Sequence, residues 1–577
     1  MNIARRSMLG IASTALAACS RTQGQYFGDT QAPRTSRLVY VLGGEIDTLD
    51  PPLSLGGFEF YVIPALFEGL TQQHPERSEP MAGLATHYRV NEDFTRFTFY
   101  MRGHPSPEGI RLPSTSDLRA EFSRGRPDVP NSAPAYWSDG SRITAHDFVY
   151  SWRRIADPKT ASPHAALCFF IKNAEEINLG ARNPQELGVQ ALDDYTFQVD
   201  LLSPCAFFLG HINAYMFAAV PRQAIEAARK RGVGSSWTSP DHIVTSGAYR
   251  LLERRPYERT VAVRNPTYYD SARAGIEELI FITVVDGTTA MNLYRSGDVA
   301  ATPGWGLPPL FTSVLEDKKD FHIAPAFSTI FPAISIRKPP CDNILVRYAL
   351  NMATDKDEFT RFLAGGVRTA RTLVPPLEGY PELKGLPVDI DGRIYDVLAF
   401  NVAGARALLT KAGVLPEVDY HFPGLPDARA KAEILQQQWK HNLGITVRAV
   451  PRELNVHQRM VAAADYTGVA DFAYGPQQVD PNPFLEMFKV ASPNPSGWTD
   501  PDFVHRLNEA NSTIDPLDRL SKLAGCERQL LSVMPFIPLY YDSWKYLQKP
   551  FIRGLASNLS DVRLFKYAWI DTDWRPS

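Results

Sequence analysis

Segments with the periodicity of strands alternate with segments of helical periodicity along most of the 577 residues. Residues 196–201 alternate polar and apolar side chains, which is typical of a half-buried strand, whereas residues 148–155 repeat apolar side chains at helical spacing. The chain contains no short-period repeat of the solenoid kind. Because interleaved strands and helices pack as sheets covered by helices, this pattern predicts an α/β protein with two lobes.

Local sequence signals predict where individual helices and strands begin and end. Thr144, followed three residues later by Asp147, forms a capping-box sequence that predicts a helix start, and Asp157-Pro158 predicts the end of that helix. Further helices are predicted over residues 346–353, 403–412, 430–442 and 515–531. Strands are predicted over residues 38–42, 94–102, 196–201, 247–251, 261–264, 276–285, 445–450 and 536–541.

The charge balance of the chain argues against a nucleic-acid partner. The sequence has 60 Lys and Arg residues and 63 Asp and Glu residues, which gives a formal net charge of −3. A nucleic-acid-binding protein would concentrate basic residues on one face. The 46 prolines and 38 glycines predict a fold with many loops.

The first 19 residues have the composition of an export signal. An arginine pair, Arg5-Arg6, precedes an uncharged apolar run at residues 8–18, which is too short to span a bilayer. The run ends in Leu16-Ala17-Ala18-Cys19, which resembles the lipobox of bacterial lipoproteins and predicts lipidation of the cysteine. We therefore expect a lipoprotein signal peptide at residues 1–18 and a polar tether at residues 19–37 that holds the protein at a bacterial membrane. A plain secretory signal is the alternative, and the arginine pair leaves Sec and twin-arginine export open.

The remaining cysteines and the motif content point away from metal chemistry and catalysis. Cys168, Cys205, Cys341 and Cys526 are widely separated, and no CxxC pair or Cys/His cluster has the spacing of a zinc site. Disulfides and buried free thiols both stay open for these residues. No GxSxG, HExxH, P-loop or GxGxxG motif occurs. We therefore predict that the protein is not an enzyme and needs no metal or cofactor.

A series of short motifs runs along the chain. The most distinctive one extends from Trp137-Ser138-Asp139-Gly140 to Trp152-Arg153-Arg154 and Asp157-Pro158. The others are Thr48-Leu49-Asp50-Pro51, Leu66-Phe67-Glu68-Gly69-Leu70, Ser246-Gly247-Ala248-Tyr249, Asn265-Pro266-Thr267-Tyr268-Tyr269-Asp270, Tyr294-Arg295-Ser296-Gly297-Asp298 and Lys338-Pro339-Pro340 with Val346-Arg347-Tyr348-Ala349-Leu350. In this order the motifs resemble the extracellular solute-binding proteins of oligopeptide and dipeptide ABC importers. The resemblance extends from about Leu38 to Trp569.

The resemblance implies a two-lobed, periplasmic-binding-protein-like α/β fold that encloses its ligand between the lobes. Lobe I would comprise residues 38–72, 219–305 and 546–577, with an extra subdomain inserted at residues 73–218, and lobe II would comprise residues 306–545. Most motif residues would serve the fold: the large rings Trp137, Trp152, Tyr249 and Tyr268 are predicted to lie in the core.

The resemblance also implies where an extended peptide would pair with strand edges of both lobes. In lobe I the ligand strand falls at Leu55-Gly56-Gly57-Phe58, where the two glycines would let a ligand backbone approach closely. An ordinary Gly-Gly turn is the alternative. In lobe II the ligand segment falls within residues 471–485, which include Tyr474, Gly475, Gln477 and Asp480.

Two alignments of the lobe II segment stay open. Counted forward from Asp471, Asp480 takes the place of the carboxylate that binds a peptide's amino group, with a two-residue deletion before Phe484. Counted back from the Asp-Pro pair, Gln477 takes that place and Tyr474 replaces the preceding aromatic residue. The first alignment predicts peptides with a free amino terminus, and the second predicts a ligand without a free amine at that end. A simple loop turn at Asp480-Pro481 is a further alternative.

The signal sequence and the resemblance together predict a monomeric, lipid-anchored receptor in the periplasm or at the cell surface. Its partners would be a peptide or peptide-sized solute and an ABC permease. A non-peptide solute such as an opine or a sugar conjugate fits the same fold. A sensor or chaperone without a transport role is the third class.

Overall fold

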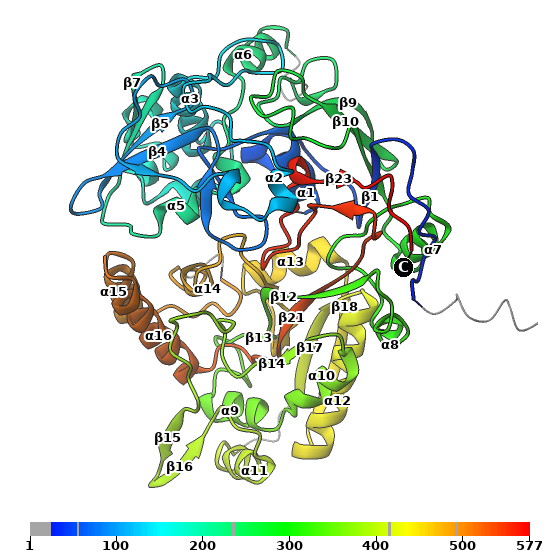
Figure 1. The fold of residues 1–577 in the computed structure, drawn as a ribbon. Helices are drawn as coiled ribbons and strands as arrows, with labels where there is room; N and C mark the ends of the chain where they lie inside the picture. The colour runs from blue at the N-terminus through cyan, green and yellow to red at the C-terminus, as the bar shows by residue number, and fades with distance from the viewer. Residues whose placement is uncertain (1–24, 55–56, 233–236, 414–416, 491–493, 577) are drawn as a thin grey trace, which may run out of the picture.

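The structure is a computed structural model that describes residues 25–54, 57–232, 237–413, 417–490 and 494–576. Two lobes lie one above the other in Figure 1, and the red C-terminal strands return from the lower lobe to the upper one. Both lobes combine sheets with helices, so the predicted two-lobed α/β fold is confirmed.

Lobe I, the upper body in Figure 1, is built on a four-stranded sheet in the order β1-β11-β10-β9. Its strands β1 and β11 are parallel, with Tyr40 opposite Phe281, and the other pairs are antiparallel. The side chains of Tyr40 and Phe281 are buried in one large apolar core that continues into the inserted subdomain. The elements of this body are β1 (Arg37–Leu42), α1 (Glu59–Leu66), β2 (Thr71–Gln73), β3 (Pro80–Ala82), α6 (Arg222–Lys230), β9 (Tyr249–Arg255), β10 (Arg259–Arg264), β11 (Glu278–Thr283), α7 (Gly287–Ser296), β22 (Ile552–Arg553) and β23 (Trp569–Ile570).

A five-stranded sheet in the order β6-β4-β5-β8-β7 forms the inserted subdomain. The predicted capping box is present, because Thr144 and Asp147 exchange hydrogen bonds at the start of helix α3. The ring of Trp152 on this helix is fully buried and donates Nε1–H to the carbonyl oxygen of Phe217 at 3.0 Å. The elements are β4 (Ala85–Val90), β5 (Arg96–Met101), β6 (Ile110–Arg111), α2 (Ala120–Ser123), α3 (Ala145–Ala156), α4 (Ala174–Asn178), β7 (Val189–Asp193), β8 (Thr196–Asp200) and α5 (Phe208–His211).

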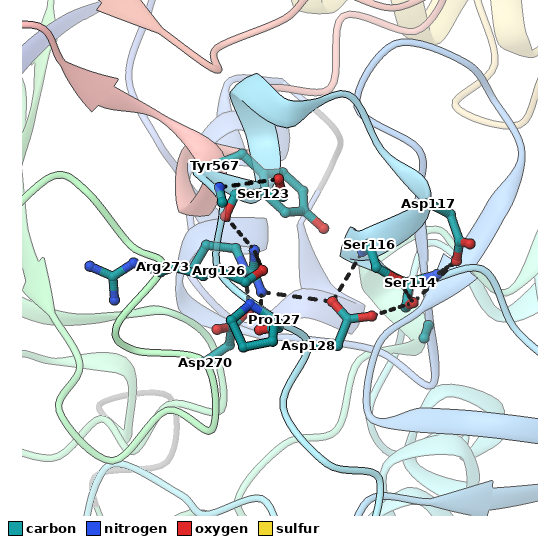
Figure 2. A network of polar contacts seen from close by, with 12 residues as sticks. Ser114, Ser116, Asp117, Ser123, Arg126, Pro127, Asp128, Asp270, Arg273 and Tyr567 are labelled. Atoms are coloured by element: carbon teal, nitrogen blue, oxygen red, sulfur yellow. Dashed lines mark hydrogen bonds and ion pairs between the residues drawn. The ribbon is translucent and has the colours of Figure 1, made fainter.

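A buried arginine of lobe I fastens a long loop of the subdomain. Arg273 donates to the carbonyl oxygens of Ser123 and Pro127 at 2.8 and 3.1 Å and pairs with Asp270 at 2.6 Å. Within the loop, Asp128 accepts hydrogen bonds from the Ser114 hydroxyl and the Ser116 backbone amide, as Figure 2 shows. These contacts hold the subdomain against lobe I, because a buried guanidinium needs acceptors for its N–H groups.

Lobe II, the lower body, contains two four-stranded sheets in the orders β14-β21-β12-β20 and β13-β19-β17-β18. Its strands are β12 (Phe321–Ile330), β13 (Ala333–Ile334), β14 (Arg368–Thr369), β15 (Pro387–Ile390), β16 (Arg393–Asp396), β17 (Glu417–Pro423), β18 (Thr446–Arg452), β19 (Val469–Ala470), β20 (Ala473–Tyr474) and β21 (Tyr540–Leu547). Its helices are α8 (Thr312–Leu315), α9 (Ile344–Met352), α10 (Lys356–Leu363), α11 (Val402–Lys411), α12 (Pro426–Leu443), α13 (Leu454–Ala462), α14 (Asn482–Glu486), α15 (Pro501–Asn511) and α16 (Pro516–Val533).

Strand β21 links the two lobes and corrects one predicted boundary. The sequence predicts a strand at residues 536–541, but β21 begins at Tyr540 because Pro538 cannot donate to a ladder. The strand continues to Leu547, whose carbonyl oxygen accepts from the amide of Thr302 at 2.9 Å. The sheet of lobe II is therefore hydrogen-bonded to lobe I along the connecting segments. The lobe boundaries derived from the resemblance stay a prediction.

The four cysteines in the described residues are free and buried. Burial raises the pKa of each thiol. Of the two alternatives that the sequence leaves open, the structure therefore has the free thiols. Within the described segments, no helix is both long enough and apolar enough to cross a bilayer.

Candidate ligand-binding site

A cavity of about 320 Å³ lies between lobe I, the inserted subdomain and lobe II. Lobe I contributes the segment around Glu68 and the C-terminal residues up to Lys566, the subdomain contributes Phe207 to Tyr215, and lobe II contributes residues 477–480. The predicted lobe II segment therefore reaches the cavity through Gln477 and Asp480.

Strand β20 leads into this part of the cavity wall. It pairs with β12, with Tyr474 opposite Thr329, and it is the last strand of its sheet among the described residues. The outer edge of β20 therefore offers unpaired backbone groups of the kind that an extended peptide can bind. Tyr474 and Gly475 do not line the cavity: the Tyr474 ring packs edge-on against Phe484 at 5.3 Å, and Gly475 lies close to Ser328.

Both carboxylate oxygens of Asp480 are already hydrogen-bonded. Arg519 on α16 donates Nη1 and Nη2 to them at 2.7 and 2.8 Å, and the backbone amide of Asn482 donates to Oδ1 at 2.8 Å. Asp480 is 8% exposed and Arg519 is 4% exposed. The guanidinium also lies 4.1 Å from the ring centre of Phe207 in the subdomain. Asp480 is thus half of a buried, bidentate ion pair at the junction of two parts of the molecule.

The sequence itself indicates that Arg519 is buried, although Arg519 belongs to none of the motifs that carry the resemblance. It lies on the helix predicted over residues 515–531, four residues before Leu523, seven before Cys526 and eleven before Leu530. These three residues are buried, so the arginine shares the apolar face of its helix. A charged residue on an apolar face indicates a buried partner, although the spacing does not identify that partner.

The two glutamines beside Asp480 connect lobe II to the rest of the molecule. Ser560 donates its hydroxyl to the carbonyl oxygen of Gln477 at 2.8 Å. A hydrogen bond of 2.8 Å joins Gln478 Oε1 to Nδ1 of His211, whose Nε2 lies 2.9 Å from the carbonyl oxygen of Leu167. His211 is half-buried and reaches across to lobe II.

The wall of the cavity contains a second ion pair. Glu68 Oε1 accepts hydrogen bonds from Lys566 Nζ at 2.7 Å and from the hydroxyls of Tyr268 and Tyr269 at 3.2 Å each. Burial disfavours the charged amine of Lys566, but the Glu68 carboxylate outweighs this effect and raises the pKa of Lys566. Glu68 belongs to a motif of the resemblance, whereas nothing in the sequence marks Lys566.

The predicted lobe I residues do not line the cavity where they are described. Leu55 and Gly56 lie outside the described residues. Gly57 and Phe58 form a bend that leads into α1, not an extended strand, and the Phe58 ring stacks on Trp305 with 4.6 Å between ring centres. This packing accounts for the position of Phe58 without a ligand. Ligand contact by residues 55–58 stays a prediction.

Lobe II contains a further cavity of about 670 Å³ with an acidic side chain in its wall. Glu527 accepts hydrogen bonds from the backbone amides of Leu373 and Val374 at 2.7 and 2.8 Å and from the Tyr380 hydroxyl at 2.9 Å. Burial raises the pKa of Glu527 to about 7, although these hydrogen bonds oppose the shift. In the described parts of the chain, no three His, Cys, Asp or Glu side chains are placed to hold a metal ion together.

Comparison with known proteins gives the same architecture. The periplasmic oligopeptide-binding protein OppA of Salmonella typhimurium is 30% identical over 569 residues, with 96% of each chain covered. The structure of the Escherichia coli murein tripeptide binding protein MppA matches with a TM-score of 0.77 and 26% identity, over 94% of this chain and 99% of that one. A structure of MppA in its unliganded open form matches with a TM-score of 0.68, 26% identity and 94% and 98% coverage.

The family comparison covers the middle of the chain. Residues 134–496 match the family described as bacterial extracellular solute-binding proteins, family 5 Middle. This range takes in most of the inserted subdomain, the central strands of lobe I and most of lobe II, including Gln477 and Asp480. The chain belongs to family 5 of the bacterial extracellular solute-binding proteins.

Proposed function

We propose that this protein captures a peptide or peptide-sized solute between its two lobes and delivers it to an ABC permease. The observation that carries the proposal is the cavity between lobe I, the subdomain and lobe II, whose wall takes residues from all three parts. The relatives support the ligand class, because their names describe oligopeptide and murein tripeptide binding. Their names describe binding proteins, and we propose a non-catalytic role here as well.

Ligand capture would combine backbone pairing with closure of the lobes. An extended peptide would pair with the open edge of β20, and Gln477 and Asp480 would form the adjoining wall. Contacts between the parts, such as His211 with Gln478 and Phe207 with Arg519, would form only when the lobes meet. A ligand that touches both lobes would therefore shift the population toward the closed state.

We also propose that the mature protein is a monomer anchored to a bacterial membrane through lipid on Cys19. The support is the sequence alone, since Cys19 lies outside the described residues. A diacylglycerol group carries two acyl chains, which suffice for stable attachment. The lobe ranges derived from the resemblance belong to the same proposal.

The test uses residues 20–577, purified, unfolded and refolded to remove any carried ligand. Its thermal midpoint is measured against di- to pentapeptides, opines and sugar conjugates, because a ligand at 100 times its Kd stabilises the folded state by about 2.7 kcal/mol. A shift with peptides supports the proposal. A shift with non-peptides alone keeps a receptor but contradicts the peptide assignment, and no shift with any compound favours a sensor or chaperone.

A further inference from the structure

We infer that the ligand end entering the cavity beside Gln477 carries no free ammonium group. The inference rests on the proposed function and deepens it, because it names the class of ligand. It assigns to the cavity a peptide-sized ligand whose amino end is acylated or otherwise joined through an amide.

The first support is the state of Asp480. An ammonium group in a buried site needs a carboxylate partner, since an unpaired buried charge is heavily penalised. Both oxygens of Asp480 already accept from Arg519, and Oδ1 accepts from Asn482 as well. An ammonium at Asp480 would lie beside Arg519, which is itself buried against Phe207, so a single carboxylate would have to neutralise two buried cations.

The second support is the state of Glu68, the other acidic residue among the described residues of the lining. Its Oε1 accepts from Lys566 and from two tyrosine hydroxyls. Its Oε2 lies buried without a partner, so it is not exposed to the cavity. Each acidic side chain of the described lining is therefore neutralised by a cation of the protein.

The third support is the chemistry of the remaining polar wall. Apart from Lys566, the partner of Glu68, the other polar side chains of the described lining are neutral amides and hydroxyls, among them Gln72, Gln73, Asn213, Tyr215 and Gln477. Amides donate to and accept from an acylated nitrogen and its carbonyl without any charge to desolvate. Gln477 also occupies the amine-binding place in one of the two alignments. The wall is thus suited to an amide and not to an ammonium.

The test compares matched ligands on the refolded chain. Each peptide of a tri- to pentapeptide series is titrated by calorimetry with its amino terminus free and with the same terminus acetylated. We expect the acetylated form to bind at least about tenfold more tightly. Equal binding, or tighter binding of the free amine, overturns the inference and leaves the receptor function intact. If neither form binds, the proposed function fails and the inference fails with it.

Two substitutions locate the effect. Gln477→Glu keeps the shape of the side chain but adds a carboxylate, and we expect it to move the preference toward the free amine by at least about tenfold. An unchanged preference would contradict the placement of the ligand end.

Asp480→Asn should lower the thermal midpoint, because it leaves Arg519 without a counter-charge, while the ratio between the affinities for the two ligand forms stays unchanged. A selective loss of the free-amine form in Asp480→Asn would overturn the inference. If that variant does not fold, the ligand pairs and Gln477→Glu still decide.

Discussion

At the level of single residues, burial determines which charged groups are available to a ligand. Asp480 and Glu68 both line the cavity, yet each faces a cation of the protein at 2.7 Å. Glu527 differs, because its neighbours are two backbone amides and a tyrosine hydroxyl with no cation among them. Burial without a counter-charge raises the pKa of this carboxyl.

The raised pKa of Glu527 predicts a pH-dependent stability. The folded-state pKa of about 7 exceeds the ordinary value of 4.5, so between these pH values the folded protein binds more protons than the unfolded chain. The stabilising contribution is therefore fully present below pH 4.5 and is lost as the pH rises through 7. Over that window it amounts to about 3 kcal/mol. The measurement is urea unfolding at several pH values. As the pH rises from 4.5 to 7, the free energy of unfolding of the wild type should fall, relative to that of Glu527→Gln, by an amount of that order. Parallel pH profiles of the two proteins would contradict the assignment.

At the level of elements, the predictions that the structure confirms rest on residues that lie close together in the sequence. Thr144 and Asp147 predict the start of α3, and both halves of the capping box are present. The predicted helix at residues 515–531 appears as α16 at Pro516–Val533. The predicted start of the strand at 536–541 was wrong. The apolar pattern of that segment does not show that Pro538 lacks a backbone N–H to donate. The periodicity of apolar side chains indicates which face of a segment is buried, but it does not indicate which backbone N–H and C=O groups are hydrogen-bonded.

The cap of α3 gives a prediction at this scale. Thr144→Ala removes the hydroxyl that faces the first turn and should destabilise the protein by about 1 kcal/mol. Thr144→Ser is the matched control, since it keeps the hydroxyl. Denaturant unfolding of the three proteins measures the difference. Equal loss in both variants would assign the effect to the methyl group instead of the cap.

At the level of the whole molecule, contacts between the subdomain and lobe II would hold the closed state. The bond between His211 and Gln478 and the stacking of Arg519 on Phe207 both cross between these parts. Helices α5 and α14 lie on facing sides of the two bodies in Figure 1. The energy of these contacts adds to that of a ligand, so their loss should weaken ligand binding without unfolding either lobe.

Gln478→Ala tests this coupling. Loss of one hydrogen bond across the lobes should weaken ligand binding about three- to tenfold, because a net hydrogen bond is worth roughly 1 kcal/mol. Gln190→Ala, at an exposed position of the subdomain sheet, is the control. Calorimetry measures affinity, and small-angle scattering measures compaction on ligand addition. An unchanged affinity in Gln478→Ala would show that this bond does not contribute to closure.

The proposed anchor gives the last prediction at this scale. Cys19→Ala removes the thiol that would carry the lipid, so the protein should move from the membrane fraction to the soluble fraction after export. Cys526→Ala is the matched control, because that thiol is buried inside lobe II. Fractionation followed by immunoblotting gives the readout. A Cys19→Ala protein that stays with the membrane would refute the anchor.

The sequence by itself determined the α/β class, several of the helices and strands, and the family, because periodicity, caps and ordered motifs are local properties of the chain. It also identified Gln477 and Asp480 as candidate ligand-binding residues but left open which of them occupies the amine-binding position. Only the tertiary structure decided the partners: Asp480 with Arg519, 39 residues away, Glu68 with Lys566, 498 residues away, and His211 with Gln478, 267 residues away. Such pairs form because packing brings distant elements together and a buried charge must find its counter-charge there. No spacing along the chain encodes that encounter.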